Sequence, residues 1–378
     1  MKVAGLYIHV PFCISKCFYC DFVSYPYAKE PAECYAAALE KEILLRSQEI
    51  RNQAVFESIY LGGGTPTCLP VPILRRILAV IRENFEILPQ AEITVEANPG
   101  TARKNLLRML RHEGVNRLSI GMQTGEAGLL LFLGRRHTPA DVVKMVEEAR
   151  DAGFDNLNLD LIFGIPGQTV LMWKKSLKDA LALRPEHIST YGLEIHPGTP
   201  LGRSVEAGEI SLCPEEDERE MYLEAIDFLA VCGYEQYEIS NFALPGKASR
   251  HNRLYWEGEP YLGIGPAAHS YFNGCRWSNA EDIDVYCGLI ERERLPVVWQ
   301  THLSVQDEMS EAMFLGLREL AGVSCRRFRE RFGQRPEKAY GREIQQLLER
   351  GLLTREGDFL RLTREALPVA NVVFGEFV

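Results

Sequence analysis

Short apolar runs alternate with longer amphipathic stretches along the first half of the chain, from residue 5 to about residue 195. The runs that predict strands are Gly5–Val10, Ser58–Leu61, Glu92–Glu96, Arg117–Gly121, Asn156–Ile162 and Ile188–Glu194. The stretches between them predict helices, among them Ala36–Ile50, Val71–Asn84, Ala140–Ala152 and Leu171–Leu183. Strands that alternate with helices are typical of βαβ units and a parallel sheet. We therefore expect an α/β fold, a partial (β/α)6 TIM-like barrel with its chemistry at the C-terminal ends of the strands.

The pattern changes after about residue 200. Gly202–Ile210 is expected to be a polar loop, and Glu215–Cys232 a charged amphipathic helix. Tyr234–Phe242 predicts another strand, and the stretch Arg250–Phe272 that follows is rich in glycine and aromatic residues. These features predict a core over residues 1–240 and a connecting segment over residues 241–300.

The last part of the chain predicts a smaller unit over residues 301–378. Ser304–Arg318 begins with a serine cap and an acidic first turn, as a helix start should. Cys325–Phe332 and Tyr340–Arg350 predict two shorter helices, and Leu352–Leu362 predicts a hairpin. Helices followed by a hairpin resemble a winged-helix domain. Because this part lacks a dominant basic stripe, we expect it to pack on the core or cover it rather than to bind DNA.

Composition narrows the class of protein. The 378 residues are 46% hydrophobic and 25% charged, which is typical of a globular chain with a sizeable core. A net charge of −10 argues against nonspecific binding to nucleic acid. No apolar stretch approaches the length of a signal sequence or a membrane span. Ten cysteines without a secretion signal indicate reduced thiols and a cytoplasmic location.

Three of these cysteines have the spacing of metal ligands. Cys13, Cys17 and Cys20 form a C-x3-C-x2-C motif. Cysteine thiolates are the usual ligands of iron–sulfur clusters, and three of them leave one iron of a [4Fe–4S] cluster open to a small chelating molecule. Zinc is the main alternative, with His9 or Cys34 as a fourth ligand, although structural zinc sites usually have other spacings.

The motif, with the aromatic Tyr19 directly before its last cysteine, resembles the signature of the radical S-adenosylmethionine (SAM) superfamily. The flanking residues Tyr7-Ile-His-Val-Pro-Phe-Cys and Cys20-Asp-Phe are similar to the HemN-like branch, which is related to coproporphyrinogen III oxidase. The resemblance extends over nearly the whole chain. It implies that SAM binds the open iron and that an electron from the cluster, delivered by a separate donor, cleaves it to methionine and a 5′-deoxyadenosyl radical.

Further residues fit a SAM site at the mouth of the barrel. Gly63, Gly64 and Thr65 lie in a glycine-rich turn after a strand, where backbone N–H groups can approach a ligand closely, although a plain tight turn is an equal alternative. In similar proteins this element meets the methionine amino end of SAM. The other residues assigned to this site are Tyr7, Tyr19, Glu96, Gln123, Arg135 and Asp160.

Each of those assignments has its own reason. Glu96 ends the third strand and can accept hydrogen bonds from the SAM ribose, unless it is an exposed loop carboxylate. Gln123 and Arg135 fit polar and carboxylate contacts. Asp160 is an acid inside an apolar strand, where an unpaired charge is costly to bury, which favours a functional role. Tyr7 and Tyr19 have core packing as their alternative role.

Two features separate this chain from true coproporphyrinogen III oxidases. Those enzymes extend the motif to C-x3-C-x2-C-x-C, and here Phe22 occupies the extra position. They also have a longer extension before the motif. Both departures argue against decarboxylation of coproporphyrinogen.

A second element favours another relative. His251, Tyr255 and Trp256 form an H-N-x-x-Y-W element that resembles the HemW-type heme chaperones, which bind heme and pass it to membrane respiratory enzymes. Imidazole is a normal ligand of heme iron, and aromatic rings offer flat surfaces to a porphyrin. His9 and His269 are competing ligands. The alternative is that His251 is a hydrogen-bonded pocket residue and that Tyr255 and Trp256 pack in the core.

The sequence therefore leaves two functions open. The first is a heme chaperone that carries a [4Fe–4S] cluster, SAM and heme, and delivers heme to an acceptor protein that the sequence does not identify. The second is a radical SAM enzyme that acts on a porphyrin or a related substrate, as an oxidase or as a methyltransferase.

Overall fold

The computed structural model describes residues 1–378, and at its centre lies a 12-stranded sheet. Six neighbouring strands of this sheet run parallel, in the order in which they occur along the chain. They are β1 (Lys2–Val10), β4 (Ala54–Gly63), β5 (Ile87–Ala97), β6 (Arg117–Gln123), β7 (Leu157–Phe163) and β8 (His187–Gly192). The partial (β/α)6 barrel predicted from the sequence is confirmed.

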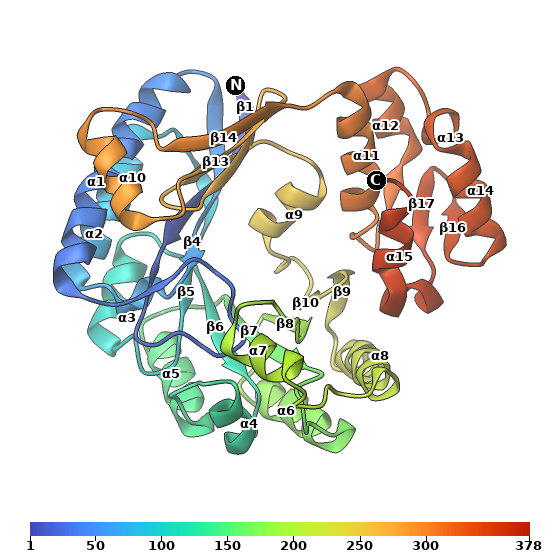
Figure 1. Ribbon diagram of the computed structural model, residues 1–378, viewed down its shortest axis with the longest axis horizontal. Helices are drawn as coiled ribbons and strands as arrows, with labels where there is room; N and C mark the ends of the chain where they lie inside the picture. Colours follow the sequence, from blue (N-terminus) through green and yellow to red (C-terminus); the bar gives the residue numbers. More distant parts are fainter.

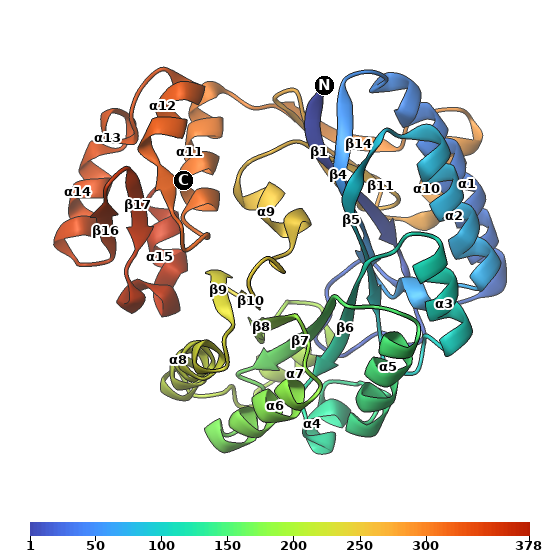
Figure 2. The ribbon, with the colours of Figure 1, turned by 180° about the vertical axis from the view of Figure 1, so that it is seen from behind.

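Helices cover the outer face of the curved sheet, as Figures 1 and 2 show. They are α1 (Lys29–Glu49), α2 (Val71–Asn84), α3 (Lys104–His112), α4 (Ala127–Phe132), α5 (Pro139–Asp151), α6 (Val170–Ala182) and α8 (Glu215–Val231). Their apolar faces and the strands form one core cluster of 61 buried residues. The start of α5 is defined by a capping box between Thr138 and Asp141, which satisfies backbone N–H groups that the first turn leaves free.

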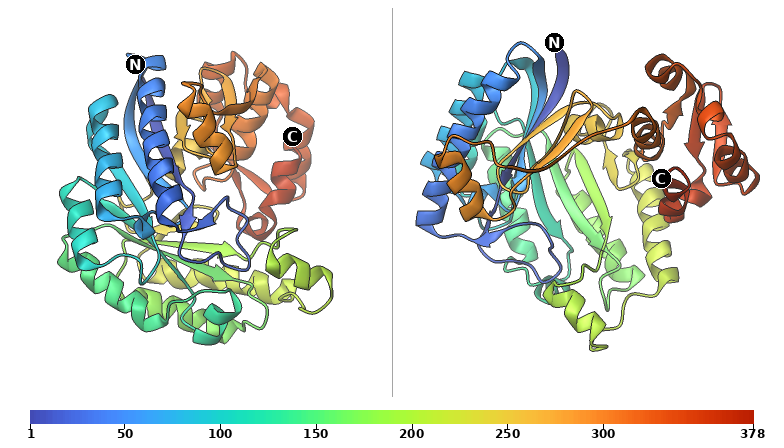
Figure 3. Two further views of the ribbon diagram at one scale, coloured as in Figure 1. Left: turned by 60° about the vertical axis from the view of Figure 1, so that its left-hand side comes forward. Right: turned by 45° about the horizontal axis from the view of Figure 1, so that its top comes forward.

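The sheet continues beyond β1 with four strands that follow the barrel in the sequence. They are β11 (Tyr261–Ile264), β12 (His269–Phe272), β13 (Cys275–Asn279) and β14 (Val297–His302). The strand β11 is parallel to β1, with Gly5 opposite Tyr261, so its C-terminal end reaches the same edge as the barrel strands. The helix α10 (Ile283–Glu291) packs beside α1 (Figure 3).

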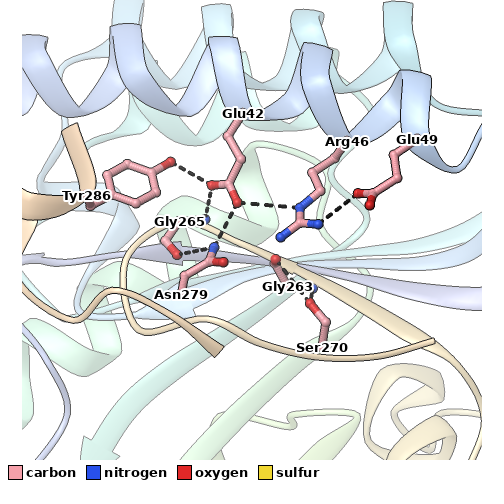
Figure 4. Close-up of polar contacts among 8 residues, drawn as sticks. All are labelled: Glu42, Arg46, Glu49, Gly263, Gly265, Ser270, Asn279 and Tyr286. Atoms are coloured by element: carbon pink, nitrogen blue, oxygen red, sulfur yellow. Dashed lines mark hydrogen bonds and ion pairs between the residues drawn. The ribbon is translucent and has the colours of Figure 1, made fainter. Parts of the chain in front are cut away.

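A buried carboxylate ties this extension to the barrel (Figure 4). Glu42 of α1 accepts hydrogen bonds from the Tyr286 hydroxyl at 2.7 Å, the Asn279 amide at 2.7 Å and the Gly265 N–H at 2.9 Å. The carboxylate also forms an ion pair with the buried Arg46, whose Nε lies 3.8 Å from Glu42 Oε1. Burial raises the pKa of Glu42, and Arg46 and the three donors oppose that shift. The network holds the turn after β11 in place.

Two sequence predictions were wrong in detail. Gly202–Ile210 was expected to be a loop, but α7 (Pro200–Glu206) occupies most of it. Thr199 caps this helix, and Gly202 suits it because a Cβ there would lie 2.2 Å from the His196 carbonyl oxygen. Tyr234–Phe242 was expected to be one strand, but it forms the antiparallel pair β9 (Glu235–Glu238) and β10 (Asn241–Ala243).

The C-terminal unit comprises the elements from α11 to α15 and has a separate apolar cluster of 16 buried residues. Its helices are α11 (Val305–Gly316), α12 (Cys325–Phe332), α13 (Pro336–Ala339), α14 (Gly341–Glu349) and α15 (Ala370–Gly375), with the 3-10 helix η2 (Arg364–Val369). A small sheet joins β15 (Val323–Ser324), β17 (Phe359–Leu362) and β16 (Leu353–Glu356). The winged-helix-like arrangement agrees with the sequence prediction. Between this unit and the barrel lies α9 (Arg250–Trp256), as Figure 1 shows. No helix of the chain combines the length and apolar character needed to cross a membrane.

Candidate functional site

The three motif cysteines lie in a loop that follows the C-terminal end of β1. The short strand β2 (Phe12–Cys13) pairs with β3 (Tyr25–Pro26), and Cys17 and Cys20 lie in the loop between them. The backbone of Phe18 anchors this loop: its N–H donates to the Leu133 carbonyl at 3.0 Å, and its carbonyl accepts from the Leu201 N–H at 2.9 Å. The loop is therefore held at the barrel mouth, as the sequence predicted for the chemistry of such a fold.

A chain of polar contacts joins the first two cysteines. The Cys13 sulfur lies 3.5 Å from the Thr65 hydroxyl, which accepts a hydrogen bond from the Asn98 amide at 2.6 Å. The side-chain oxygen of Asn98 in turn accepts a hydrogen bond from the Arg135 guanidinium, which also donates to the Cys17 sulfur at 3.4 Å. These five residues form a continuous polar ring around the cysteine loop.

Burial raises the pKa of two motif thiols in the absence of metal, that of Cys20 to about 11 and that of Cys13 in the same direction. The positive charge of Arg135 opposes the shift at Cys13. Metal binding requires thiolates, and binding deprotonates them. Arg135 is therefore well placed to stabilise the negative charge of a bound cluster.

The structure offers no complete set of ligands for a zinc ion. No three His, Cys, Asp or Glu side chains of the chain are grouped closely enough to hold one metal ion. A cubane cluster needs wider spacing than a zinc ion, because each cysteine binds a different iron. Neither fourth ligand considered for zinc is available: Cys34 lies on α1 in a different cavity, with Cys287. Both ring nitrogens of His9 are hydrogen-bonded, one with the Tyr7 hydroxyl at 3.0 Å and one with the Val23 carbonyl at 2.8 Å.

The glycine-rich turn after β4 packs directly on this loop and leads into a 3-10 helix, η1 (Pro66–Cys68). The Gly64 N–H donates to the Val10 carbonyl at 2.9 Å, and a Cβ on Gly64 would lie 2.6 Å from the Phe12 carbonyl oxygen. Gly63 has φ +98°, and a Cβ there would lie 2.3 Å from the His9 ring. The glycines are therefore required by close packing as well as by backbone conformation.

Glu96 lies beside this turn. Its carboxylate accepts hydrogen bonds from the Tyr60 hydroxyl at 2.7 Å and the Gly63 N–H at 3.1 Å. Burial raises the pKa of Glu96 to about 7, against the effect of these two donors. The alternative of an exposed loop carboxylate is not what the structure shows, because Glu96 is half-buried inside the barrel.

Other predicted SAM residues lie around the same mouth. Gln123 adopts the left-handed conformation, φ +65°, at the end of β6, where few residues other than glycine are found. A Cβ on Gly121 would lie within 3 Å of the Gln123 amide and the Arg135 guanidinium, so this glycine leaves room for both side chains. Backbone strain of this kind is often found at ligand sites.

Asp160 has polar neighbours within the barrel. Its carboxylate accepts hydrogen bonds from the Asn158 amide at 2.8 Å and from the Ser119 hydroxyl at 3.1 Å. Side chains of the neighbouring strand positions therefore replace water around this acid. Burial raises its pKa. Tyr7 packs near Tyr60, and Tyr19 packs against the small apolar cluster below α4, so both tyrosines also have the packing role that the sequence left open.

Asn98 was missed in the sequence, although it connects Thr65 to Arg135. A signal was present: Asn98 follows directly on β5 and precedes Pro99-Gly100, so it is a polar residue at the carboxyl end of a barrel strand. Such positions carry the chemistry of barrel proteins.

The residues of the H-N-x-x-Y-W element lie on α9, away from the cysteine loop. The start of α9 is held by Glu92 of β5, which accepts from the N–H groups of Arg250 and His251 at 3.2 Å. His251 is 2% exposed, and both of its ring nitrogens are engaged, with the Ser58 hydroxyl at 2.8 Å and the Tyr255 hydroxyl at 3.0 Å. Burial lowers the pKa of His251 to about 3, so the ring is neutral.

Tyr255 and Trp256 instead line a cavity of about 310 Å³. The cavity lies between α9, the strands β11 to β13, and the helices α11 and α12, so that barrel and C-terminal unit both contribute to it. His269 also lines it. The structure therefore brings two of the three predicted heme residues together with one of the competing histidines.

Comparison with known families gives two matches along the chain. Residues 7–180 match the radical SAM superfamily, and residues 303–369 match the HemN C-terminal domain. The fold resembles a solved structure of coproporphyrinogen III oxidase (HemN) from Escherichia coli, with a TM-score of 0.87. That likeness covers 100% of this chain and 90% of the other at 23% identity, so it concerns the fold alone.

Curated relatives are more similar in sequence. The protein named heme chaperone HemW in Bacillus subtilis is 38% identical over 375 residues, which are 98% of either chain. Its namesake in Lactococcus lactis is 36% identical and covers 100% of this chain and 98% of its own. The namesake in Mycobacterium tuberculosis is 33% identical, over 98% of this chain and 93% of its own.

Proposed function

The chain belongs to the radical SAM superfamily and, within it, to the HemW family of heme chaperones, and on this premise we propose that it binds heme and passes it to an acceptor protein. The scaffold that does so also holds a [4Fe–4S] cluster and SAM. The observation that carries the proposal is the aromatic cavity beside α9, because it offers Tyr255 and Trp256 to a flat apolar ligand.

The polar ring around the cysteine loop supports the cofactor part of the proposal. Cys13, Cys17 and Cys20 hold the cluster, and Arg135 stabilises its charge. Bound and reduced, the cluster supplies an electron for cleavage of a C–S bond in SAM. The glycine-rich turn, which packs on the cysteine loop, would lie at the methionine end of SAM, and the carboxylate of Glu96 would orient its ribose.

The alternative function is a radical SAM enzyme that modifies a porphyrin or a related substrate. The complete set of cysteines and the polar residues at the barrel mouth favour it, since they equip the chain for SAM cleavage. Decarboxylation of coproporphyrinogen III is not expected, because Phe22 occupies the position of the additional cysteine and is 61% exposed.

One anaerobic experiment separates the two functions. Cluster-loaded protein is titrated with heme, then incubated with SAM and a reductant, and the tetrapyrrole is recovered and weighed by mass spectrometry. We expect about one heme per chain, recovered with its mass unchanged, and only slow cleavage of SAM. Rapid SAM turnover coupled to a new tetrapyrrole mass would establish the enzyme instead, and no binding of heme would refute the chaperone.

A further inference from the structure

His269 has the properties of an available metal ligand. It begins β12, its side chain is exposed, and no group of the protein hydrogen-bonds to its ring. By contrast, both ring nitrogens of the buried His251 are hydrogen-bonded, one to the Ser58 hydroxyl and the other to the Tyr255 hydroxyl. An iron ligand must present a free nitrogen lone pair. Of the two histidines, only His269 does so in this structure.

The walls of the cavity suit a porphyrin. Tyr255 and Tyr261 meet edge to face with ring centroids 4.6 Å apart, and Tyr271 continues this aromatic wall at 6.5 Å from Tyr261. Phe314 and Leu315 of α11 supply apolar surface from the C-terminal unit. A flat, largely apolar ring gains most from surfaces of this kind.

Two arginines at the cavity suit the anionic edge of such a ligand. Arg276 is paired with Glu311 at 2.6 Å and 3.0 Å, so its charge is already matched. Arg331 is held more loosely, by Glu308 at 3.5 Å and the Tyr271 hydroxyl at 3.2 Å. Arg331 is therefore the cation that a carboxylate can recruit with the smaller loss of existing contacts.

We propose that this cavity is the heme site, with His269 as the iron ligand and Arg331 as the partner of a propionate. The proposal rests on the proposed function, because it names where the heme of that function binds. His251 is then a positioning residue: it holds the hydroxyl of Tyr255, and so keeps that ring in the cavity wall. Because both the barrel and the C-terminal unit line the site, a movement between them would open it for release.

The test is an anaerobic heme titration of the cluster-loaded protein, followed by absorbance and electron paramagnetic resonance. His269→Ala should change the Soret band and the iron spectrum and weaken binding by more than about 10-fold, since even outer-shell partners of metal ligands contribute about 10–100-fold. His251→Ala should weaken binding by no more than about 10-fold and leave the iron spectrum unchanged. The control is His112→Ala, an exposed histidine of α3, which should behave as the wild type.

A second variant tests the cavity without touching a histidine. Ala312 lines the cavity from α11, so Ala312→Trp should fill it and block heme while the iron–sulfur absorbance stays normal. The inference is overturned if His269→Ala and Ala312→Trp both titrate as the wild type, or if His251→Ala alone changes the iron spectrum. In either case the wild type still binds heme, so the proposed function survives. It fails separately if the wild type binds none.

Discussion

At the scale of single residues, the cysteine loop shows how thiols are kept available for a metal. The Cys13 sulfur contacts the hydroxyls of Thr65 and Ser24, and the Cys17 sulfur accepts from Arg135. Cys68 lies close by but donates its thiol to the Phe12 carbonyl at 3.4 Å, and burial raises its pKa to about 12. Proximity alone therefore does not make this fourth cysteine a ligand.

Replacing any one motif cysteine should abolish the cluster. In Cys13→Ala, Cys17→Ala and Cys20→Ala, we expect no iron–sulfur cluster after anaerobic reconstitution, because a cubane loses one of its three protein ligands. Cys68→Ala, Cys34→Ala and Cys213→Ala are the controls and should retain about four irons and four sulfides per chain. Stoichiometric zinc in protein purified without oxygen, with no iron after reconstitution, would contradict this assignment.

The raised pKa of Glu96 predicts a pH dependence of SAM binding. Below its pKa of about 7, the Glu96 side chain is neutral. Above that pH it is a carboxylate, which accepts hydrogen bonds from the Gly63 N–H and from a ribose hydroxyl. SAM affinity should therefore rise between pH 6 and pH 8, by up to about 10-fold, because the charged fraction changes by that factor. Calorimetry on Glu96→Gln should show weaker binding with this rise removed. An identical rise in the variant would assign the titration to another group.

Residue roles were only partly predictable from the sequence. The cysteines could be singled out by their spacing, and Glu96 and Asp160 as acids at strands, and the roles assigned to them stay predictions. The two hydrogen bonds of the His251 ring could not be predicted, because its partner Ser58 is distant in the sequence and approaches only when α9 packs against β1 and β4. A sequence does not distinguish a histidine with an unpaired ring nitrogen from one whose ring nitrogens are both hydrogen-bonded.

At the scale of elements, close contact with β2 limits the size of the side chains that the turn after β4 can carry. Gly64→Ala should disturb this contact, because the new Cβ would lie 2.6–2.8 Å from backbone atoms of Val10 and Phe12, which cannot rotate away. We expect the variant to fold but to reconstitute less cluster and bind SAM poorly. Gly288→Ala on α10, where a Cβ meets nothing within 4 Å, is the matched control. Equal iron content in the two variants would refute the role of this contact.

The buried carboxylate on α1 makes a prediction about stability. Glu42→Ala leaves Arg46, Tyr286 and Asn279 without their acceptor, and removal of one partner of a buried ion pair typically lowers the free energy of unfolding by about 3–5 kcal/mol. Glu49→Ala removes the exposed partner of the same arginine and should lower it by about 1 kcal/mol or less. Denaturant titrations measure both. Equal losses would show that burial of Glu42 is not the decisive property.

The elements with strong apolar periodicity could be predicted from the sequence. Six barrel strands and α2 lie where the pattern places them, because burial against a common core imposes that pattern. The helix α7 was missed because it is short and includes Gly202, which is needed for contact with His196. The turn between β9 and β10 was missed because Ile239-Ser240 contains neither glycine nor proline, and Ser240 alone is a weaker turn signal.

At the scale of the whole molecule, α9 lies between the barrel strands and the aromatic cavity. The cysteine loop follows the C-terminal end of β1, while α9 packs against the middle of β4 and β5 through Ser58 and Glu92, with the His251 ring 5.1 Å from that of Tyr60. The aromatic cavity lies beyond α9, against the C-terminal unit.

Transfer of intact heme tests this account most directly. Cluster-loaded protein carrying one equivalent of heme is mixed anaerobically with apomyoglobin, used as a generic acceptor, and the Soret band and the recovered tetrapyrrole are followed. We predict that the acceptor gains stoichiometric heme of unchanged mass, with SAM and cluster still on the donor. Failure to load heme at all, or recovery of a chemically altered tetrapyrrole in a SAM-dependent reaction, would contradict the account.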